Sequence, residues 1–322
     1  MKKIVISFLI LMLAVAAGCS PKFKLFTGQA TSPLKESVLE GEGDAKILLV
    51  NVNGFLDDKP KSGLLTSKPG SVQELVSNLR LAEQDEDIKG VVVKINSPGG
   101  TTTASDILYR ELMRYREKTG NKVVALMMDV AASGGYYTAL AADSIVAHPT
   151  TITGSVGVIF MRPKVDGLME KIGVDVEISK SGMDKDMGSP FRATTDRERR
   201  LFQEIIDDMA GRFYALVQER RNPTRAAMDE IKTARVFTAT RARELGLIDH
   251  VGYMQDAFAE ARKLAGVSEA RIVTYRRDQY PNDNPYNTLS SADPANPALV
   301  NMHIEHLVPR QAGFYYLWSP SY

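Results

Sequence analysis

The residues of this sequence most able to carry out chemistry are a serine and the two glycines that follow it. Ser133 lies in the segment Asp129–Tyr137 (DVAASGGYY), between an apolar run and a short helical pattern. A hydroxyl on such a tight turn projects from the backbone, and glycine lets a substrate backbone approach closely. The N–H group of Gly134 would then be placed to bind a developing oxyanion. A serine before two glycines can also be a plain helix cap, and Ala131 replaces the first glycine of the G-x-S-x-G turn.

A second glycine pair ends the segment Asn96–Gly100 (NSPGG), which follows another apolar run. The N–H groups of this pair could complete an oxyanion-binding site. A Pro-Gly-Gly sequence at the end of a strand is also an ordinary turn. The residue pattern alone leaves both interpretations open.

A serine nucleophile needs a base, and the histidines do not provide an obvious one. His148 follows an apolar run, His250 lies far along the chain, and His303 and His306 lie in a proline-rich tail. None of them forms a recognisable Ser-His-Asp pattern, although a histidine distant in sequence could lie near the serine in space. His303 and His306 have a spacing that could bind a metal. No cluster of carboxylates or cysteines accompanies them, so we expect neither a metal nor another cofactor.

Apolar runs that alternate with helical patterns must position these turns. Four strands are predicted, over 46–53, 91–95, 123–128 and 145–147. Continuous apolar runs of this kind are typical of strands covered on both faces. Helices are predicted between them, the first opened by a capping box of Ser71 and Glu74. This alternation predicts right-handed crossovers and a largely parallel sheet, so the fold class is α/β.

Two further helices are predicted beyond the sheet. Thr195 and Glu198 would cap a long amphipathic helix. A second helical stretch runs over 238–245 and ends at Gly246, a residue type common just after a helix. The tail that follows is rich in proline and asparagine and ends in the aromatic segment 314–318 (FYYLW).

The composition is that of an ordinary globular protein. The chain has 322 residues, of which 44% are hydrophobic and 25% charged, enough for one large domain or two small ones. Its 40 basic and 39 acidic side chains nearly cancel, so we expect no nucleic-acid partner.

The first residues have the pattern of an export signal. Two lysines precede an apolar run over 4–17, which is too short to span a bilayer comfortably but is typical of a secretory signal. The run ends in AAGC, which resembles the lipobox of bacterial lipoproteins, and Cys19 is the only cysteine of the chain. We therefore predict a lipoprotein-type signal peptide over 1–18, and a lipid anchor with a polar linker over 19–45. An ordinary signal peptide with an incidental cysteine is the alternative.

Several segments, taken in order along the chain, resemble the signal peptide peptidase A (SppA) family, which shares the ClpP/crotonase fold. They are NSPGG at 96–100, the serine segment at 129–147, GSVGV at 154–158, and TA at 238–239 followed by LGLID at 245–249. The resemblance spans roughly 47–264 and the aromatic end of the tail. It implies a ClpP/crotonase-like spiral of mostly parallel strands covered by helices. This peptidase domain would occupy 46–277, with a C-terminal helical part and an extended tail over 278–322.

Carried over residue by residue, the resemblance implies a Ser-Lys dyad. The nucleophile falls on Ser133 and its general base on Lys185. A supporting hydroxyl, which in the family hydrogen-bonds the lysine, falls on Ser155. The oxyanion donors would be the backbone N–H groups of Gly100 and Gly134.

A lysine acts as a base only when it has lost its proton. Its reference pKa is about 10.4, so removal from water must lower that value. Lys185 lies between Asp184 and Asp186, whose carboxylates would favour the charged form. Without the resemblance, Lys185 would be interpreted as a solvated charge in a loop.

The resemblance also implies peptide substrates, among them signal-peptide fragments, bound as extended strands. It implies a homo-oligomer, in which the dyad could form within one chain or between chains. The aromatic tail could pack on a neighbouring subunit or on its own core. A lipidated Cys19 would hold the protein at a membrane of the cell envelope, facing the periplasm or the exterior.

Two other functions are compatible with the same fold. A crotonase-like acyl-CoA enzyme would share the oxyanion geometry without needing Ser133 or Lys185. A catalytically degenerate lipoprotein would act as a scaffold or binding module, although both catalytic positions are intact here.

Overall fold

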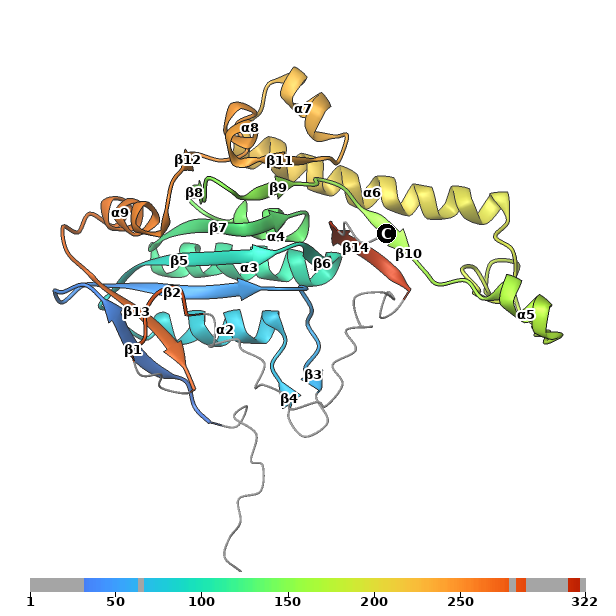
Figure 1. Ribbon diagram of the computed structural model, residues 1–322, viewed down its shortest axis with the longest axis horizontal. Helices are drawn as coiled ribbons and strands as arrows, with labels where there is room; N and C mark the ends of the chain where they lie inside the picture. Colours follow the sequence, from blue (N-terminus) through green and yellow to red (C-terminus); the bar gives the residue numbers. More distant parts are fainter. Residues whose placement is uncertain (1–31, 63–66, 278–281, 288–311, 319–322) are drawn as a thin grey trace, which may run out of the picture.

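The computed structural model describes residues 32–62, 67–277, 282–287 and 312–318 (Figure 1). Within these ranges the central feature is a nine-stranded sheet with the order β1-β13-β2-β5-β7-β8-β12, in which β9 joins β7 and β11 joins β9. The strands are β1 (Lys35–Glu40), β2 (Lys46–Asn53), β5 (Ile88–Ser97), β7 (Lys122–Ala132), β8 (Ser144–Ala147), β9 (Ile152–Gly154), β11 (Val236–Thr238), β12 (His250–Val251) and β13 (Arg271–Arg276). Strands β13, β2, β5, β7, β8 and β12 pair in parallel, and β9 is parallel to β7. The predicted α/β fold with a mostly parallel sheet is confirmed.

Helices cover both faces of this sheet, as the apolar runs predicted. Along β2, Ile47 and Leu49 point to one face, where they pack with α9 (Met254–Ala265). Leu48 and Val50 point to the other face, which is covered by α2 (Ser71–Ala82), α3 (Thr102–Thr119) and α4 (Gly134–Ala139). The alternation repeats along β5 and β7, so successive side chains fill two separate cores.

The remaining helices lie beyond the sheet, and an extended segment precedes the longest of them. They are α5 (Asp166–Ile172), α6 (Asp196–Arg221), α7 (Arg225–Ile231) and α8 (Ala239–Glu244). The predicted capping box of Thr195 and Glu198 opens α6, and Gly246 follows α8 with a φ of 76°. We call residues 162–195 the arm. In Figure 1 the arm and the beginning of α6 project away from the sheet.

The capping box predicted for Ser71 and Glu74 is wrong. The N-cap residue of α2 is Gly70, and no side chain caps this helix. The Ser71 hydroxyl instead accepts a hydrogen bond from the N–H of Asp57 and donates one to its carbonyl. Glu74 forms an ion pair with Arg277. Contacts distant in sequence therefore replace the local cap.

A small antiparallel sheet lies beside the main one. Its order is β10-β14-β6, formed by β10 (Ile159–Met161), β14 (Gly313–Leu317) and β6 (Gly99–Thr101). In the register of this sheet Tyr316 faces Gly100, and Phe314 faces Phe160. The aromatic end of the tail thus packs on its own chain, between two segments that are far apart in sequence.

The linker expected over 19–45 is shorter than predicted, because part of it belongs to the main sheet. Strand β1 pairs antiparallel with β13 along the edge that β13 would otherwise expose. A strand so exposed and so poor in apolar residues gives little signal in the sequence. A short hairpin of β3 (Lys61–Ser62) and β4 (Ser67–Lys68) lies after β2.

The predicted signal peptide and the lipidation residue Cys19 lie outside the described residues, as do His303 and His306. Among the helices that the structure describes, none combines the length and the apolar character needed to cross a bilayer. No group of three or more potential metal ligands occurs in the described part of the chain.

Candidate active site

Ser133 occupies the turn between β7 and α4. It is the N-cap residue of α4, with φ 51° and ψ −114°, a left-handed conformation that is costly for a residue with a side chain. The hydrogen bond from its N–H to the carbonyl of Gly154, at 2.8 Å, helps to hold this turn. The serine is 1% exposed, and its Oγ atom has no hydrogen-bond partner among the described residues. A buried hydroxyl without a partner is costly and is typical of a functional site.

The two glycine turns predicted as oxyanion donors lie side by side. A methyl group added at Gly99 would lie 2.8 Å from the amide nitrogen of Gly134 and 1.9 Å from the carbonyl oxygen of Tyr316. One added at Gly100 would lie 2.0 Å from the carbonyl oxygen of Leu56. Three backbone segments therefore meet beside Ser133 with no room for a side chain.

Ser155, predicted as a supporting hydroxyl, lies next to this turn. Strand β9 pairs with β7 so that Ala132 faces Gly154, and Ser155 follows directly. Ser155 also has a left-handed conformation, with φ 50°, and its N–H donates to the carbonyl of Arg235 at 2.9 Å. The structure thus brings the turns of Ser133, Gly100, Gly134 and Ser155 together.

Two side chains that the sequence analysis did not single out fix these turns. The Asn96 side chain accepts a hydrogen bond from the N–H of Val130 and donates to Asp129, which ties the end of β5 to the end of β7. The Ser97 hydroxyl accepts from the N–H of Gly99 and donates to the carbonyl of Gly54. Both residues belong to NSPGG, where their polar character next to the glycine pair was the available signal.

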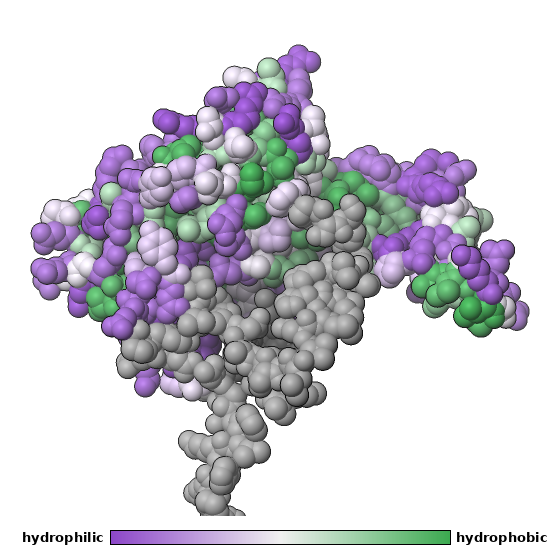
Figure 2. Space-filling view, viewed as in Figure 1, coloured by the Kyte–Doolittle hydropathy of each residue, from purple (hydrophilic) through white to green (hydrophobic). Residues whose placement is uncertain are grey.

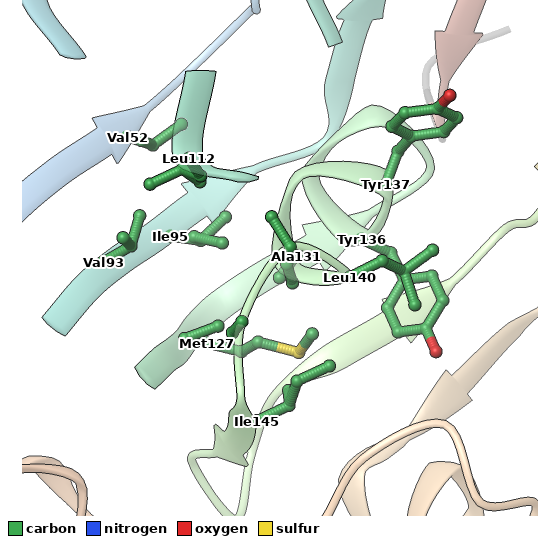
Figure 3. Close-up of a cluster of buried hydrophobic side chains, with 14 of the residues drawn as sticks. Val52, Val93, Ile95, Leu112, Met127, Ala131, Tyr136, Tyr137, Leu140 and Ile145 are labelled. Atoms are coloured by element: carbon green, nitrogen blue, oxygen red, sulfur yellow. The ribbon is translucent and has the colours of Figure 1, made fainter. Parts of the chain in front are cut away.

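Strand β14 lies against the glycine turns beside Ser133, between two strands, as an extended peptide would. It pairs antiparallel with β6 on one side and β10 on the other, and the carbonyl of Tyr316 reaches the glycines beside Gly134. The Tyr316 side chain is buried against α4 and α6. Figure 3 shows that Tyr136 and Tyr137 leave α4 in different directions, with Tyr137 reaching toward β14.

Lys185, the predicted base, does not lie in this cluster. It is exposed, in a turn of the arm, and within the described residues its ammonium group makes no hydrogen bond or ion pair. Its neighbour Asp184 pairs with Arg197 in the first turn of α6, whereas Phe213 of the same helix contacts Tyr137 beside the site. Phe213 follows Arg197 by sixteen positions of α6, a rise of about 24 Å. A lysine side chain cannot span that distance within one chain.

The two aspartates that flank Lys185 are bound to other cations. Arg197 lowers the pKa of Asp184, and Arg192, with Lys180, holds the pKa of Asp186 far below its usual range. Arg192 also binds Glu198, whose pKa falls to about 2. Among the described residues, neither flanking carboxylate forms an ion pair with Lys185.

A buried serine hydroxyl on a strand–helix turn, next to glycine N–H groups and an extended strand, is the arrangement of a serine peptidase site. Known proteins agree with this class. The family model "Peptidase family S49" matches residues 115–268, and that for "Clp protease" matches residues 66–153. The chain belongs to peptidase family S49, the SppA family of serine proteases with a ClpP-like fold.

Individual relatives cover most of the chain. The protein of Enterococcus faecium named "Putative signal peptide peptidase SppA" is 32% identical over 255 residues, which is 79% of this chain and 74% of that protein. "Serine protease SPPA, chloroplastic" of Arabidopsis thaliana is 36% identical over 240 residues, 72% of this chain and 34% of that protein. The solved structure of a ClpP1 mutant from Listeria monocytogenes has a TM-score of 0.42 and 16% identity, covering 65% of this chain and 93% of that one.

Proposed function

We propose that this serine protease is an endopeptidase that uses Ser133 to cleave extended peptides, including fragments of signal peptides. The position of β14 supports the proposal most directly. An extended segment lies between β6 and β10 with a backbone carbonyl beside Gly134, next to the unpaired Ser133 hydroxyl. A substrate strand in the same place would gain backbone hydrogen bonds from both neighbours.

The proposal gives each of these residues a role. Ser133 Oγ attacks the substrate carbonyl, and the N–H groups of Gly100 and Gly134 stabilise the oxyanion that forms. Lys185 takes the serine proton and returns it to the departing amine, while the Ser155 hydroxyl orients the lysine. Water then hydrolyses the acyl-enzyme.

In this proposal the base comes from a second copy of the chain. The position of Lys185 on the arm, about 24 Å along α6 from the pocket side of the site, supports this part of the proposal. Apolar side chains are exposed near α5, where Leu168 is 60%, Ile172 63% and Val174 49% exposed (Figure 2). Contact with a neighbouring copy would cover these side chains and strip water from Lys185, which would make the homo-oligomer a condition of catalysis.

A serine-directed fluorophosphonate probe tests the nucleophile. We expect it to label the wild type at Ser133 and to leave Ser133→Ala unlabelled. If Ser133→Ala is labelled on another serine as fast as the wild type is labelled, Ser133 is not the nucleophile.

Mixing two inactive variants tests the base and its origin. Ser133→Ala keeps the lysine and Lys185→Ala keeps the serine, so co-refolded mixtures contain sites with both groups only if the dyad forms between chains. We expect recovery of about one quarter of wild-type activity from random equal mixing. Lys171→Ala, which removes another exposed lysine of the arm, is the control and keeps its activity. No recovery in a mixture of demonstrated hetero-oligomers would exclude the inter-chain dyad, and an active Lys185→Ala would exclude the base.

Lipidation of Cys19 would place this protein at a membrane of the cell envelope, facing the periplasm or exterior. The small-residue sequence before the only cysteine supports this part of the proposal. We expect Cys19→Ser to abolish incorporation of labelled fatty acid and to move the protein from the membrane to the soluble fraction. A fully membrane-bound Cys19→Ser protein would contradict the lipid anchor.

The two alternatives suggested by the sequence receive no support. The matching family models and the relatives named here are all peptidases, and none is an acyl-CoA enzyme. The chain also keeps Ser133, whose hydroxyl has no partner among the described residues, and the glycine turns beside it, which argues against a degenerate site.

A further inference from the structure

The pocket that receives the Tyr316 side chain is aromatic. Its ring stacks on Tyr137 with 5.1 Å between centroids and an angle of 18°, and it meets Phe213 at 4.9 Å. Tyr316 is 2% exposed, although it lies near the end of the chain. Offset-stacked and tilted aromatic contacts of this kind favour an aromatic occupant beyond the area that is buried.

The end of the pocket offers a hydrogen-bond acceptor. The Tyr316 hydroxyl donates to the carbonyl oxygen of Met209, at 3.0 Å. This carbonyl lies within α6, and a carbonyl oxygen has a second lone pair beside the one used by the helix. Burial raises the pKa of Tyr316 to about 12, so the phenol keeps its proton and remains a donor. Phenylalanine would fill the same space without this bond.

The pocket walls are held by contacts that do not involve the occupant. The Tyr137 hydroxyl donates to Asp106 at 2.7 Å, and Arg212 pairs with the same carboxylate. Tyr109 and Phe213 both meet the Tyr137 ring edge-on. The pocket is therefore preorganised for an aromatic side chain, which lowers the ordering cost of binding.

A second aromatic position lies two residues earlier on the same side of the strand. Phe314 packs against Phe160 at 4.6 Å and Phe202 at 6.4 Å. Side chains alternate along a strand, so positions 314 and 316 point the same way. A peptide that lies where β14 lies would present two alternate side chains to two aromatic pockets.

We propose that the site selects peptides with tyrosine on the amino side of the cleaved bond and an aromatic residue two positions before it. Tyr137, Phe213 and the Met209 carbonyl determine the first preference, and Phe160 with Phe202 the second. The assignment of the cleaved bond follows from the carbonyl of Tyr316, which reaches the glycines beside Gly134. This inference rests on the proposed peptidase function and names its substrate class.

The test uses the full-length wild-type protein and a fluorogenic peptide series built on the residue order of β14. The position of Tyr316 is occupied in turn by tyrosine, phenylalanine, leucine and alanine, and mass spectrometry locates the cut. We expect kcat/KM for tyrosine to exceed that for phenylalanine by about threefold to tenfold, the usual effect of one hydrogen bond. It should exceed that for alanine by about a hundredfold or more. The ratio between peptides cancels the common cost of displacing β14.

A variant links the preference to the pocket. Phe213→Leu should lower the ratio of tyrosine to leucine peptide hydrolysis about tenfold. Tyr214→Phe, at the next position of α6, is the matched control and should keep the wild-type ratio. Thermal melting shows whether Phe213→Leu folds. If it does not fold, the peptide series measured with the wild type decides the proposal.

The failures of the two proposals differ. Peptides cut at similar rates, within about twofold for all four residues, would overturn the specificity and leave the peptidase intact. A cut elsewhere than after the varied residue would overturn the assignment of the pocket. Absence of both cleavage and probe labelling at Ser133 would overturn the peptidase function on which the specificity rests.

Discussion

Backbone proximity explains the residue pattern around Ser133. Gly99 has a φ of 103°, a conformation that L side chains rarely adopt, and Gly100 lies against the carbonyl of Leu56. The backbone conformation of Gly99 and the close contact of Gly100 each exclude a side chain, whatever its chemical character. The glycine pair thus allows β6 to lie between Leu56 and β14 while its N–H groups remain near Ser133.

Replacement of Gly100 by alanine tests this close approach. The added methyl group would lie 2.0 Å from a backbone carbonyl oxygen, so β6 must move away from Ser133. We expect Gly100→Ala to lower kcat at least about a hundredfold, as for the loss of an oxyanion donor. Gly211→Ala, within α6 and with open space around it, is the control and should raise stability by about 0.5–1 kcal/mol. Unchanged kcat for Gly100→Ala would argue against a role in oxyanion binding.

At the scale of residues, short segments were predictable and long-range partners were not. The turn of Ser133, the turn of Gly100 and the neighbourhood of Ser155 each carry their signal within a few positions. Tyr137 and Phe213 lie in different helices, and nothing in their local sequence indicates that they form one pocket. The failed capping box at Ser71 has the same cause, because its partner Asp57 is distant in sequence.

The arm shows how an element can be fixed without a large core. Arg192 binds both Asp186 and Glu198, and Glu198 also accepts hydrogen bonds from the N–H and hydroxyl of Thr195. The same network pairs the Asp186 carboxylate with Arg192 and not with Lys185. It therefore joins the turn that carries the lysine to the start of α6.

Substitution of Arg192 tests how much this ion-pair network stabilises the arm. Arg192→Ala leaves the buried Glu198 carboxylate without its charged partner, and we expect the free energy of unfolding to fall by about 1–3 kcal/mol at neutral pH. Arg199→Ala removes an exposed pair with Asp196 and should change it by less than about 0.5 kcal/mol. Equal effects of the two substitutions in chemical denaturation would contradict the proposed importance of this network.

The same network predicts a dependence on pH. The pKa of Glu198 is lowered from 4.5 to about 2 in the folded chain, chiefly by Arg192. The stabilisation is therefore complete above the unfolded value and is lost as pH falls from about 4.5 toward 2. The protection factors of amides 187–198, which correct for the intrinsic pH dependence of amide exchange, should fall in this range before those of the main sheet. They should fall less steeply in Arg192→Ala, whose Glu198 carboxylate lacks the partner.

At the scale of the whole molecule, the sheet was predictable and the small sheet beside the site was not. Continuous apolar runs require cover on both faces, and the structure supplies it with α9 on one side and α2, α3 and α4 on the other. Strand β14 comes from the end of the chain and β6 consists of residues that look like a turn. No local pattern could pair them, because the pairing depends on the space left between β10 and the glycines.

Because β14 covers Ser133, the strand is expected to limit how fast a probe reaches the serine. Ser133 is 1% exposed with β14 in place, so a probe reaches it only when this strand leaves. Tyr316→Ala removes the main buried side chain of β14, at a cost of about 3–5 kcal/mol to its docking. We expect the fluorophosphonate probe to label Ser133 at least about a hundredfold faster in this variant, since every 1.4 kcal/mol is about a factor of ten. Tyr286→Ala, at a residue that is 61% exposed, is the control. Equal labelling rates would mean that β14 does not limit access.

The position of Lys185 has a consequence for the life of the protein. If Lys185 is the base, as proposed, a newly made chain holds its nucleophile on the body and its base on a distant extension, and it is inactive by itself. Hydrolysis would then begin only where copies assemble, and under the proposed lipid anchor their density on a membrane surface would take the place of a separate inhibitor. Such a chain could be exported safely, since it would acquire its hydrolytic activity only in the assembly.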